Sequence, residues 1–281
     1  VDIGRERGVG GILEARRAYE AQALDAVVVM PRGTRAMLAP RLARIPVRLG
    51  YGRGMQRRLL THAVEDWRPW RRVHRTLWLG LLARAFGVEP LPDVGLHVPA
   101  SAEAEAERLL RALGRRADVP LVVLEPGAAY GAAKCWPLDR FASLAARLRK
   151  DGLDVAVVGA PVSRPLERAI ADAAGPGLLR LVGRTPSLAV LAAVLRRASL
   201  VVANDTGPMH LAAGVGAPVL ALFGATDPAV SGPVGPSRRR LLWRPAPCSP
   251  CFLRTCVVDG HPCLQAIGVE TVLREVQEML R

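Results

Sequence analysis

A polar junction at the start of an alanine-rich helical stretch holds the residues best suited to chemistry in this sequence. Residues 204–210 read Asn-Asp-Thr-Gly-Pro-Met-His and follow a short apolar run. Asn204 or Asp205 can cap the helix that Pro208 begins, which leaves amide N–H groups of the first turn free to bind an anion. His210 lies in that first turn and can donate to a phosphate oxygen. The alternative is a well-capped core helix with a structural histidine.

A second candidate is the glycine-containing loop 126–137, Pro-Gly-Ala-Ala-Tyr-Gly-Ala-Ala-Lys-Cys-Trp-Pro. Gly127 and Gly131 let the backbone turn sharply and approach a ligand, and Lys134 supplies a compact cation. The loop lacks the Gly-Lys-Ser/Thr ending of a Walker loop and differs from the Gly-x-Gly-x-x-Gly dinucleotide fingerprint. Taken alone, it is equally consistent with a phosphate-binding loop and with a surface turn that carries a solvated lysine.

Alternating strand and helix signals place both loops at one edge of a predicted parallel sheet. Helical patterns separate the apolar runs that predict strands, at 121–124, 154–158, 178–182, 200–202 and 219–222. This alternation is typical of a doubly wound α/β fold, in which ligands bind at the carboxyl ends of the strands. Because both loops leave such strand ends, together they favour a nucleotide as the ligand.

The same pattern divides the chain into three predicted parts. Residues 99–267 are long enough for a complete α/β domain that binds the nucleotide, and residues 268–281 form a closing helix. Residues 1–98 contain a strand signal at 24–30 and a helical pattern at 34–42. They supply too few strand signals for a complete second domain, so a partial domain is predicted there.

The composition indicates a globular, basic protein. The formal net charge is +14, from 39 Lys and Arg against 25 Asp and Glu. A polyanionic partner would explain this charge, but so would a GC-rich genome, because nearly all the cations are Arg and because Ala, Gly and Pro are also abundant. Without an uninterrupted apolar run of about 18 residues or a signal-like start, the chain is predicted to be cytoplasmic.

Clustered cysteines raise the possibility of a structural zinc ion. Cys248 and Cys251 form a Cys-x-x-Cys half-site, and Cys256 and Cys263 follow at irregular spacing. Reduced, partly buried thiols are the alternative. The cluster and the charge together suggest a rival function, a basic zinc-containing nucleic-acid-binding protein, for which the Trp- and Arg-rich stretch 67–75 is the best evidence.

The two loops carry a resemblance to a known family. Residues 204–213 and 216–228 resemble the signature of the ADP-heptose:lipopolysaccharide heptosyltransferases, glycosyltransferase family 9. Loop 126–137 is most similar to that of heptosyltransferase II, and residues 45–51 fit the first half of the family. The resemblance covers most of the chain and implies a GT-B architecture, an α/β fold with parallel sheets in two Rossmann-like domains, of which the N-terminal one is incomplete here.

The resemblance also implies a reaction. Members transfer L-glycero-D-manno-heptose from ADP-heptose to the phosphorylated inner core of lipopolysaccharide, with inversion and with no cofactor required. The protein is then expected to be peripheral to the cytoplasmic surface of the inner membrane and to bind no nucleic acid. Arg48 and Arg53 would lie on the acceptor side. The residues expected to bind the donor are Gly127, Ala129, Tyr130, Gly131, Lys134, Asp205, Thr206, Gly207, Met209 and His210.

Two departures from the family qualify these expectations. Relatives begin with a strand that leads into a Gly-Asp motif, whose Asp is the expected general base. That motif would lie before Val1, so the catalytic residue is unassigned and a chain without it is expected to bind donor but to transfer poorly. Cys135 also stands where relatives commonly carry Arg, which weakens the case for a phosphate contact at this position.

Overall fold

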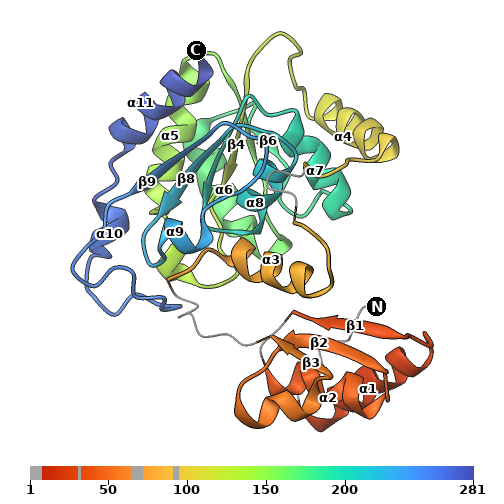
Figure 1. Cartoon of the computed structure of the whole chain (residues 1–281). Coiled ribbons are helices and arrows are strands. Elements are labelled where there is room, and N and C mark those ends of the chain that lie inside the picture. The colour runs from red at the N-terminus through yellow and green to blue at the C-terminus, as the bar shows by residue number, and fades with distance from the viewer. Residues whose placement is uncertain (1–7, 31–32, 65–71, 91–94) are drawn as a thin grey trace. The chain divides into compact units, whose positions relative to one another are not determined.

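The computed structural model describes residues 8–30, 33–64, 72–90 and 95–281. The chain divides into two compact units, Val1–Leu91 and Pro92–Arg281 (Figure 1). All strand pairs in both units are parallel, which confirms the predicted α/β class. Within the described ranges, no helix is both long and apolar enough to cross a bilayer.

The first unit contains a three-stranded sheet of order β1-β2-β3. Only one of these strands was predicted, because β2 and β3 are short and carry polar residues or glycine at Arg48, Gly50 and His62. Gly50 is needed on β2, since a Cβ there would lie 2.9 Å from the Val29 carbonyl oxygen of β1. The elements are α1 (Val9–Glu20), β1 (Ala26–Val29), α2 (Thr34–Leu42), β2 (Val47–Tyr51), η1 (Gly54–Leu59), β3 (His62–Val64) and α3 (Arg75–Ala85).

The second unit contains a six-stranded sheet of order β6-β5-β4-β7-β8-β9. Five of its strands match the predicted positions, and β9 was missed because its sequence, Arg-Arg-Leu-Leu-Trp, begins with two charges and lies at the sheet edge. The strands are β4 (Leu121–Glu125), β5 (Asp154–Val157), β6 (Leu179–Arg180), β7 (Leu200–Asn204), β8 (Val219–Phe223) and β9 (Arg239–Trp243).

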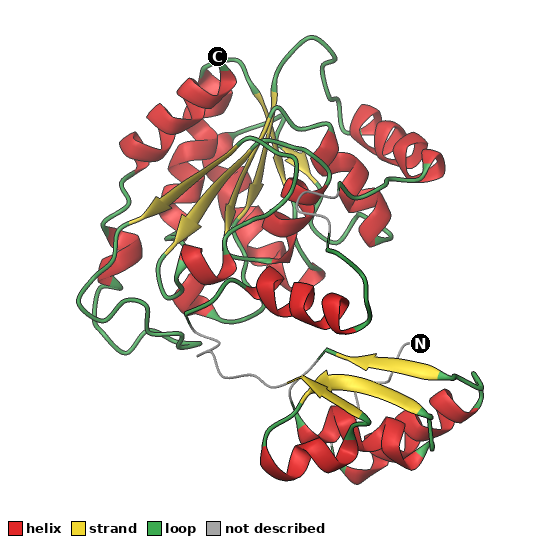
Figure 2. Ribbon diagram, in the orientation of Figure 1, coloured by secondary structure: helices red, strands yellow, loops and turns green. Residues whose placement is uncertain are grey.

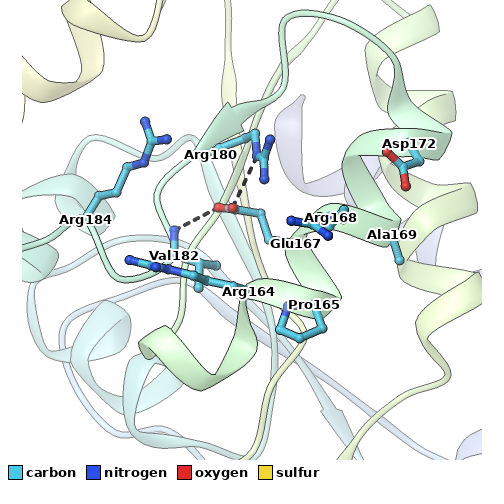
Figure 3. A pocket seen from close by; sticks show the side chains of 9 residues that line it. All are labelled: Arg164, Pro165, Glu167, Arg168, Ala169, Asp172, Arg180, Val182 and Arg184. Atoms are coloured by element: carbon cyan, nitrogen blue, oxygen red, sulfur yellow. Dashed lines mark hydrogen bonds and ion pairs between the residues drawn. The ribbon is translucent and has the colours of Figure 1, made fainter.

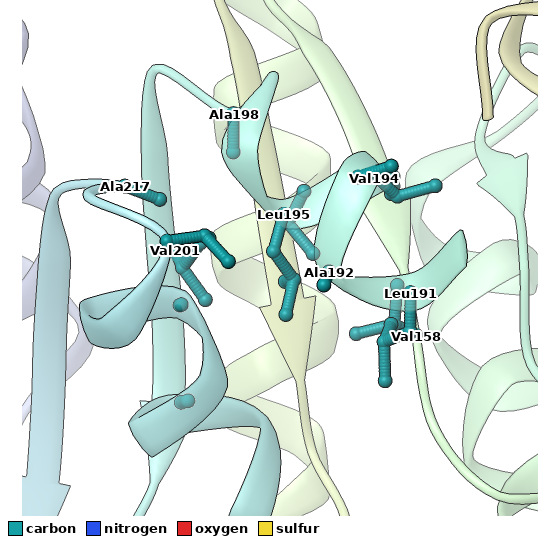
Figure 4. Packing of buried hydrophobic residues seen from close by; sticks show 14 of the residues in the cluster. Val158, Leu191, Ala192, Val194, Leu195, Ala198, Val201 and Ala217 are labelled. Atoms are coloured by element: carbon teal, nitrogen blue, oxygen red, sulfur yellow. The ribbon is translucent and has the colours of Figure 1, made fainter. Parts of the chain in front are cut away.

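Helices cover both faces of this sheet (Figure 2). The helices of this unit are α4 (Ala100–Ala112), α5 (Leu138–Lys150), α6 (Arg164–Ala174), α7 (Leu188–Arg196), α8 (Gly207–Gly214), α9 (Pro228–Ser231), α10 (Pro262–Gln265) and α11 (Val269–Leu280), with short 3-10 turns η2 (Ala132–Lys134) and η3 (Pro161–Ser163). Buried side chains of α4, α7 and α8 share one core cluster, and those of α5, α6 and α11 share the other. Figure 4 shows α7 packed through Leu191 and Leu195 in the first cluster.

The alternation of side chains along β4 explains why the second unit has two hydrophobic core clusters. Leu121 and Val123 belong to one cluster, and Val122 and Leu124 belong to the other, because successive side chains of a strand point to opposite faces. β4 and β7 are neighbours at the centre of the sheet, and the strand order runs outward from them in both directions. Their carboxyl ends therefore mark the topological switch point, where ligands bind in open α/β sheets.

Candidate functional site

Lys134 and Asp205 meet at the carboxyl ends of β4 and β7. Lys134 Nζ lies 2.5 Å from Asp205 Oδ2 and 3.3 Å from the Asp205 carbonyl oxygen. Their side chains are 11% and 4% exposed, so the pair is largely shielded from water. A shielded ion pair needs further hydrogen bonds to offset the loss of hydration, and Asp205 has them.

Asp205 is the centre of a polar cluster. The Thr226 and Ser231 hydroxyls donate to Asp205 Oδ2 at 2.7 and 3.1 Å. His210 Nε2 lies 4.0 Å from Asp205 Oδ1, on a side chain that is 46% exposed. Thr226 comes from the turn after β8, and Ser231 is the last residue of α9. Asp205 thus holds Lys134 in place and joins three loops at the switch point.

Glu125, the last residue of β4, is a second buried carboxyl beside this cluster. It is 4% exposed, and the Thr206 hydroxyl lies 2.8 Å from Glu125 Oε2. Burial raises the pKa of Glu125 to about 8, and hydrogen bonds from Thr206 and the Gly127 amide lower it by less. Glu125 is therefore mostly neutral at pH 7, so it does not repel an anion bound at the ends of these strands.

Asn204 connects the two candidate loops. It is fully buried, and its Oδ1 accepts from the Trp136 amide at 3.0 Å. Its Nδ2 donates to the carbonyl oxygens of Pro126 and Gly127 at 3.0 and 3.2 Å. The expectation that Asn204 or Asp205 caps α8 is therefore wrong, because both side chains are already engaged in contacts with other loops.

The amino terminus of α8 is left open instead. Thr206 is the N-cap residue, and no side-chain hydrogen bond caps the helix. The Thr206 hydroxyl is directed to Glu125 and to the Asn204 carbonyl oxygen. A Cβ built on Gly207 meets nothing within 4 Å. First-turn amides with open space before them can accept an anion, and the partial positive charge of the helix terminus favours one.

Loop 126–137 is supported from the other side by residues 252–254. The Tyr130 hydroxyl donates to the Phe252 carbonyl oxygen at 2.6 Å, and Lys134 Nζ lies 4.8 Å from the centre of the Tyr130 ring. Gly131 has φ +150°, and a Cβ there would lie 2.2 Å from the Arg254 carbonyl oxygen. Only glycine fits this close backbone contact, which explains the second glycine of the loop.

Three other residues around the site differ in accessibility. Met209 is fully buried in the hydrophobic core, so its side chain does not face the crevice. Ala129 is exposed on the loop. Cys135 is partly buried, and burial raises the pKa of its thiol, with a further contribution from Glu125. Of the predicted donor residues, the ones that the structure joins through direct contacts are Tyr130, Gly131, Lys134, Asp205, Thr206 and His210, and Gly127 is joined to them through Asn204.

The two residues expected on the acceptor side lie in the first unit. Arg48 is on β2, and its guanidinium donates to the carbonyl oxygens of Leu59, at 2.9 Å, and Ile45. Those bonds give Arg48 a role in holding the turns around β2. Arg53 follows β2 and is exposed at the start of η1.

The cysteine cluster does not form a metal site in the described chain. All the cysteines there are free, and no group of three or more His, Cys, Asp or Glu side chains within the described ranges is placed to hold a metal ion. Burial raises the pKa of the Cys263 thiol, and Ser249, Cys248 and Cys256 lie nearby. His261 Nε2 lies 3.0 Å from the Ala133 carbonyl oxygen, so this segment braces the Lys134 loop.

The sequence interpretation missed four residues of the site: Glu125, Asn204 as a loop connector, Thr226 and Ser231. Glu125 and Thr226 could have been predicted. Glu125 ends β4 and Thr226 follows β8, at the carboxyl edge of the sheet where the two loops were expected. Ser231 and the contacts of Asn204 carry no such signal, because they depend on how the chain returns after β8.

Comparison with known proteins identifies the family. The sequence model of glycosyltransferase family 9 (heptosyltransferase) matches residues 12–261. The chain belongs to glycosyltransferase family 9. The lipooligosaccharide heptosyltransferase 2 of Haemophilus influenzae is 29% identical over 226 residues, which cover 75% of this chain and 63% of that protein. The match thus spans less than two thirds of that relative.

Solved structures agree with the family assignment. A glycosyl transferase family 9 protein from Veillonella parvula matches with a TM-score of 0.79 at 21% identity, over 98% of this chain and 80% of that one. The Escherichia coli ADP-heptose lps heptosyltransferase II matches with a TM-score of 0.76 at 24% identity, over 96% of this chain and 81% of that one. At these identities the structures establish the fold, which confirms the predicted GT-B class. The nucleic-acid-binding alternative has no support.

Proposed function

We propose that this family 9 protein binds ADP-heptose at the β4–β7 switch point and transfers the heptose, with inversion, to the phosphorylated inner core of lipopolysaccharide. The single observation that carries the proposal is the buried Lys134–Asp205 pair beside the uncapped amino terminus of α8. Together they offer one fixed cation and the amides of Gly207 and Met209 at the place where a doubly wound sheet binds nucleotides.

The donor diphosphate would lie between Lys134 and the first turn of α8. Lysine has three donor hydrogens, and the Asp205 contacts fix the direction of the ammonium group. When the bond from the diphosphate to the heptose breaks, negative charge grows on the leaving oxygen. Donors that already point there stabilise that charge without reorganising. His210, exposed and one turn along α8, would donate to the same diphosphate or to the sugar.

Glu125 and Asp205 support this site without acting on the substrate. Both carboxyls are buried and occupied by hydrogen bonds from Thr206, Thr226 and Ser231. We assign them to positioning, Glu125 for the start of α8 and Asp205 for Lys134. The proposed transfer requires no cofactor at these residues.

Basic residues bear on the acceptor and on the cellular location. Arg53, exposed after β2, is a candidate for contact with an acceptor phosphate, whereas the Arg48 guanidinium binds backbone carbonyl oxygens. The net charge of +14 suits a phosphorylated acceptor at the cytoplasmic surface of the inner membrane, where anionic lipids attract basic proteins.

The chain offers a sharp test because it has only two lysines, Lys134 and Lys150. Lys134→Met removes the fixed cation, so we expect ADP to bind at least about tenfold more weakly, equivalent to about 1.4 kcal/mol or more. Lys150→Met, at the exposed end of α5, should leave affinity unchanged. Isothermal titration calorimetry with ADP and ADP-heptose measures both. If the unaltered protein shows no heat with either ligand, the proposal fails.

A further inference from the structure

A groove outside the Lys134–Asp205 site runs along α6 (Figure 3). It has a volume of about 570 Å³, and one wall comes from α6 while the other comes from β6 and the loop that follows it. We call it the α6 groove. Its lining residues are Arg164, Pro165, Glu167, Arg168, Ala169, Asp172, Arg180, Val182 and Arg184.

Arginines dominate the α6 groove, and most of them are unneutralised. Glu167 is buried, accepts from the Val182 amide at 2.9 Å and pairs with Arg180 at 3.2 Å. Glu167 therefore holds the Arg180 side chain in place. In the part of the chain that the structure describes, no hydrogen bond or ion pair is made by the side chains of Arg164, Arg168 or Arg184. Asp172, the remaining carboxylate, lies toward the far end of α6.

The four arginines come from both walls of the groove (Figure 3). Arg164 and Arg168 are one helical turn apart on α6, which places their Cβ atoms about 6 Å apart on one face. Arg180 and Arg184 come from the facing strand and loop (Figure 3). A guanidinium group binds two phosphate oxygens in a fork, and two such groups opposite each other can enclose a phosphate from both sides. The α6 groove is therefore suited to a ligand that carries more than one phosphate group.

The α6 groove starts next to the donor loop, since a Cβ on Gly127 would lie 2.9 Å from Oγ of Ser163, the residue before Arg164, but its β6 wall lies farther away. β6 is three strands from β7, in the order β6-β5-β4-β7, which corresponds to about 14 Å at the usual strand spacing. A diphosphate bound between Lys134 and α8 would therefore lie away from Arg180 and Arg184 on the β6 side of the groove. The proposed donor does not account for them.

We propose that the α6 groove is a second anion-binding site, which takes a ligand bearing two or more phosphate groups. The ligand is either a soluble phosphate ester or the phosphorylated headgroup of a lipid, and the shared chemistry is recognition of phosphate by paired guanidinium groups. This inference goes beyond the proposed function and does not depend on ADP-heptose being the donor.

The test uses a double variant with a matched control. Arg168→Glu with Arg184→Glu reverses two groove charges and leaves the Glu167–Arg180 pair intact. Arg244→Glu with Arg274→Glu makes the same change in net charge at two exposed arginines outside the groove. Inorganic pyrophosphate is titrated calorimetrically with saturating ADP present. Sedimentation with vesicles of phosphatidylcholine containing one third cardiolipin, whose headgroup carries two phosphates, tests the lipid source.

We expect the groove variant, but not the control, to lose affinity about tenfold or more for one of the two probes. Loss for pyrophosphate identifies a soluble ligand, and loss for the vesicles identifies a lipid. Equal behaviour of the two variants with both probes would overturn the proposal, because total charge would then explain binding. A parallel loss of ADP affinity in the groove variant would also overturn it, since the groove would then belong to the donor site.

If the charge reversal disturbs folding, Arg168→Gln with Arg184→Gln replaces it, with Arg244→Gln and Arg274→Gln as the control. A separate ADP titration of the unaltered protein distinguishes failure of this inference from failure of the proposed function. ADP binding without a groove effect contradicts only the second site.

Discussion

Three buried polar residues illustrate how this site is built at the scale of single side chains. Glu125, Asn204 and Asp205 are each at most 5% exposed, and each has hydrogen-bond partners. Burying a polar group without partners costs on the order of 1 to 3 kcal/mol, so the complete set of contacts matters. The hydrogen bonds of these residues connect the loops to one another. Lys134 and the α8 amides are then the groups that can face a ligand.

Glu125 predicts a particular dependence of stability on pH. Its pKa is raised to about 8 in the folded protein from the ordinary value of 4.5. Between these values the unfolded chain has lost the proton and the folded protein keeps it. The free energy of unfolding should therefore fall as pH rises from about 4.5 to about 8, by at most about 1.4 kcal/mol per pH unit from this group. Below and above that range, Glu125 adds no slope.

Glu125→Gln should remove this slope, because the amide has similar shape and does not ionise. Urea unfolding at pH 5, 6.5 and 8 measures the free energy of unfolding, with Asp118→Asn at an exposed position as the control. We expect the stability of Glu125→Gln relative to the unaltered protein to increase from pH 5 to pH 8. A constant difference across that range would show that Glu125 is ionised in the folded protein.

At the scale of elements, the decisive feature is that α8 begins without a side-chain cap. Thr206 occupies the cap position, but its hydroxyl is directed to Glu125. A helix that gives up a cap loses typically about 1 kcal/mol, and here the packing of α8 against the core maintains it. The free amides are then available to a ligand.

Gly207→Ala separates stability from binding at this terminus. The added Cβ meets no protein atom within 4 Å, and replacing a helical glycine reduces the entropy of the unfolded chain. We expect an unchanged or slightly higher melting temperature together with ADP affinity several-fold lower, since the methyl group occupies space next to the first-turn amides. Gly268→Ala, also in open space, should leave ADP affinity unchanged. Unaltered ADP affinity in Gly207→Ala would place the ligand away from α8.

At the scale of the whole molecule, the two units differ in how much core each encloses. The second unit has two extensive buried clusters on the two faces of its six-stranded sheet. The described part of the first unit has two small clusters around a three-stranded sheet. All the contacts of the Lys134–Asp205 site lie within the second unit.

A fragment of residues 92–281 is therefore expected to fold and to bind ADP with an affinity within about threefold of the full chain, a difference of less than about 1 kcal/mol. Circular dichroism and calorimetry measure these properties. The fragment 8–91 serves as the control and should bind no ADP. A folded 92–281 fragment without ADP affinity would show that the first unit contributes donor contacts.

Some parts of this fold were predictable because they are local. The strands β4, β5, β7 and β8 are continuous apolar runs, as expected for strands buried on both faces, and the helices between them follow the helical period. β2, β3 and β9 were missed because short or edge strands carry charges and glycine, so that their pairing partners rather than their own residues stabilise them.

The order of residues along the chain determined the family, the alternation of strands and helices, and which two loops leave neighbouring strand ends. Tertiary structure alone decided the partners of the polar side chains. Lys134 and Asp205 are 71 residues apart, and Asn204 reaches Gly127 across 77 residues. Such pairings depend on the crossing order of the strands and on buried polar atoms competing for few available donors and acceptors. For the same reason, only the folded chain showed that Asp205 binds Lys134 rather than capping its own helix.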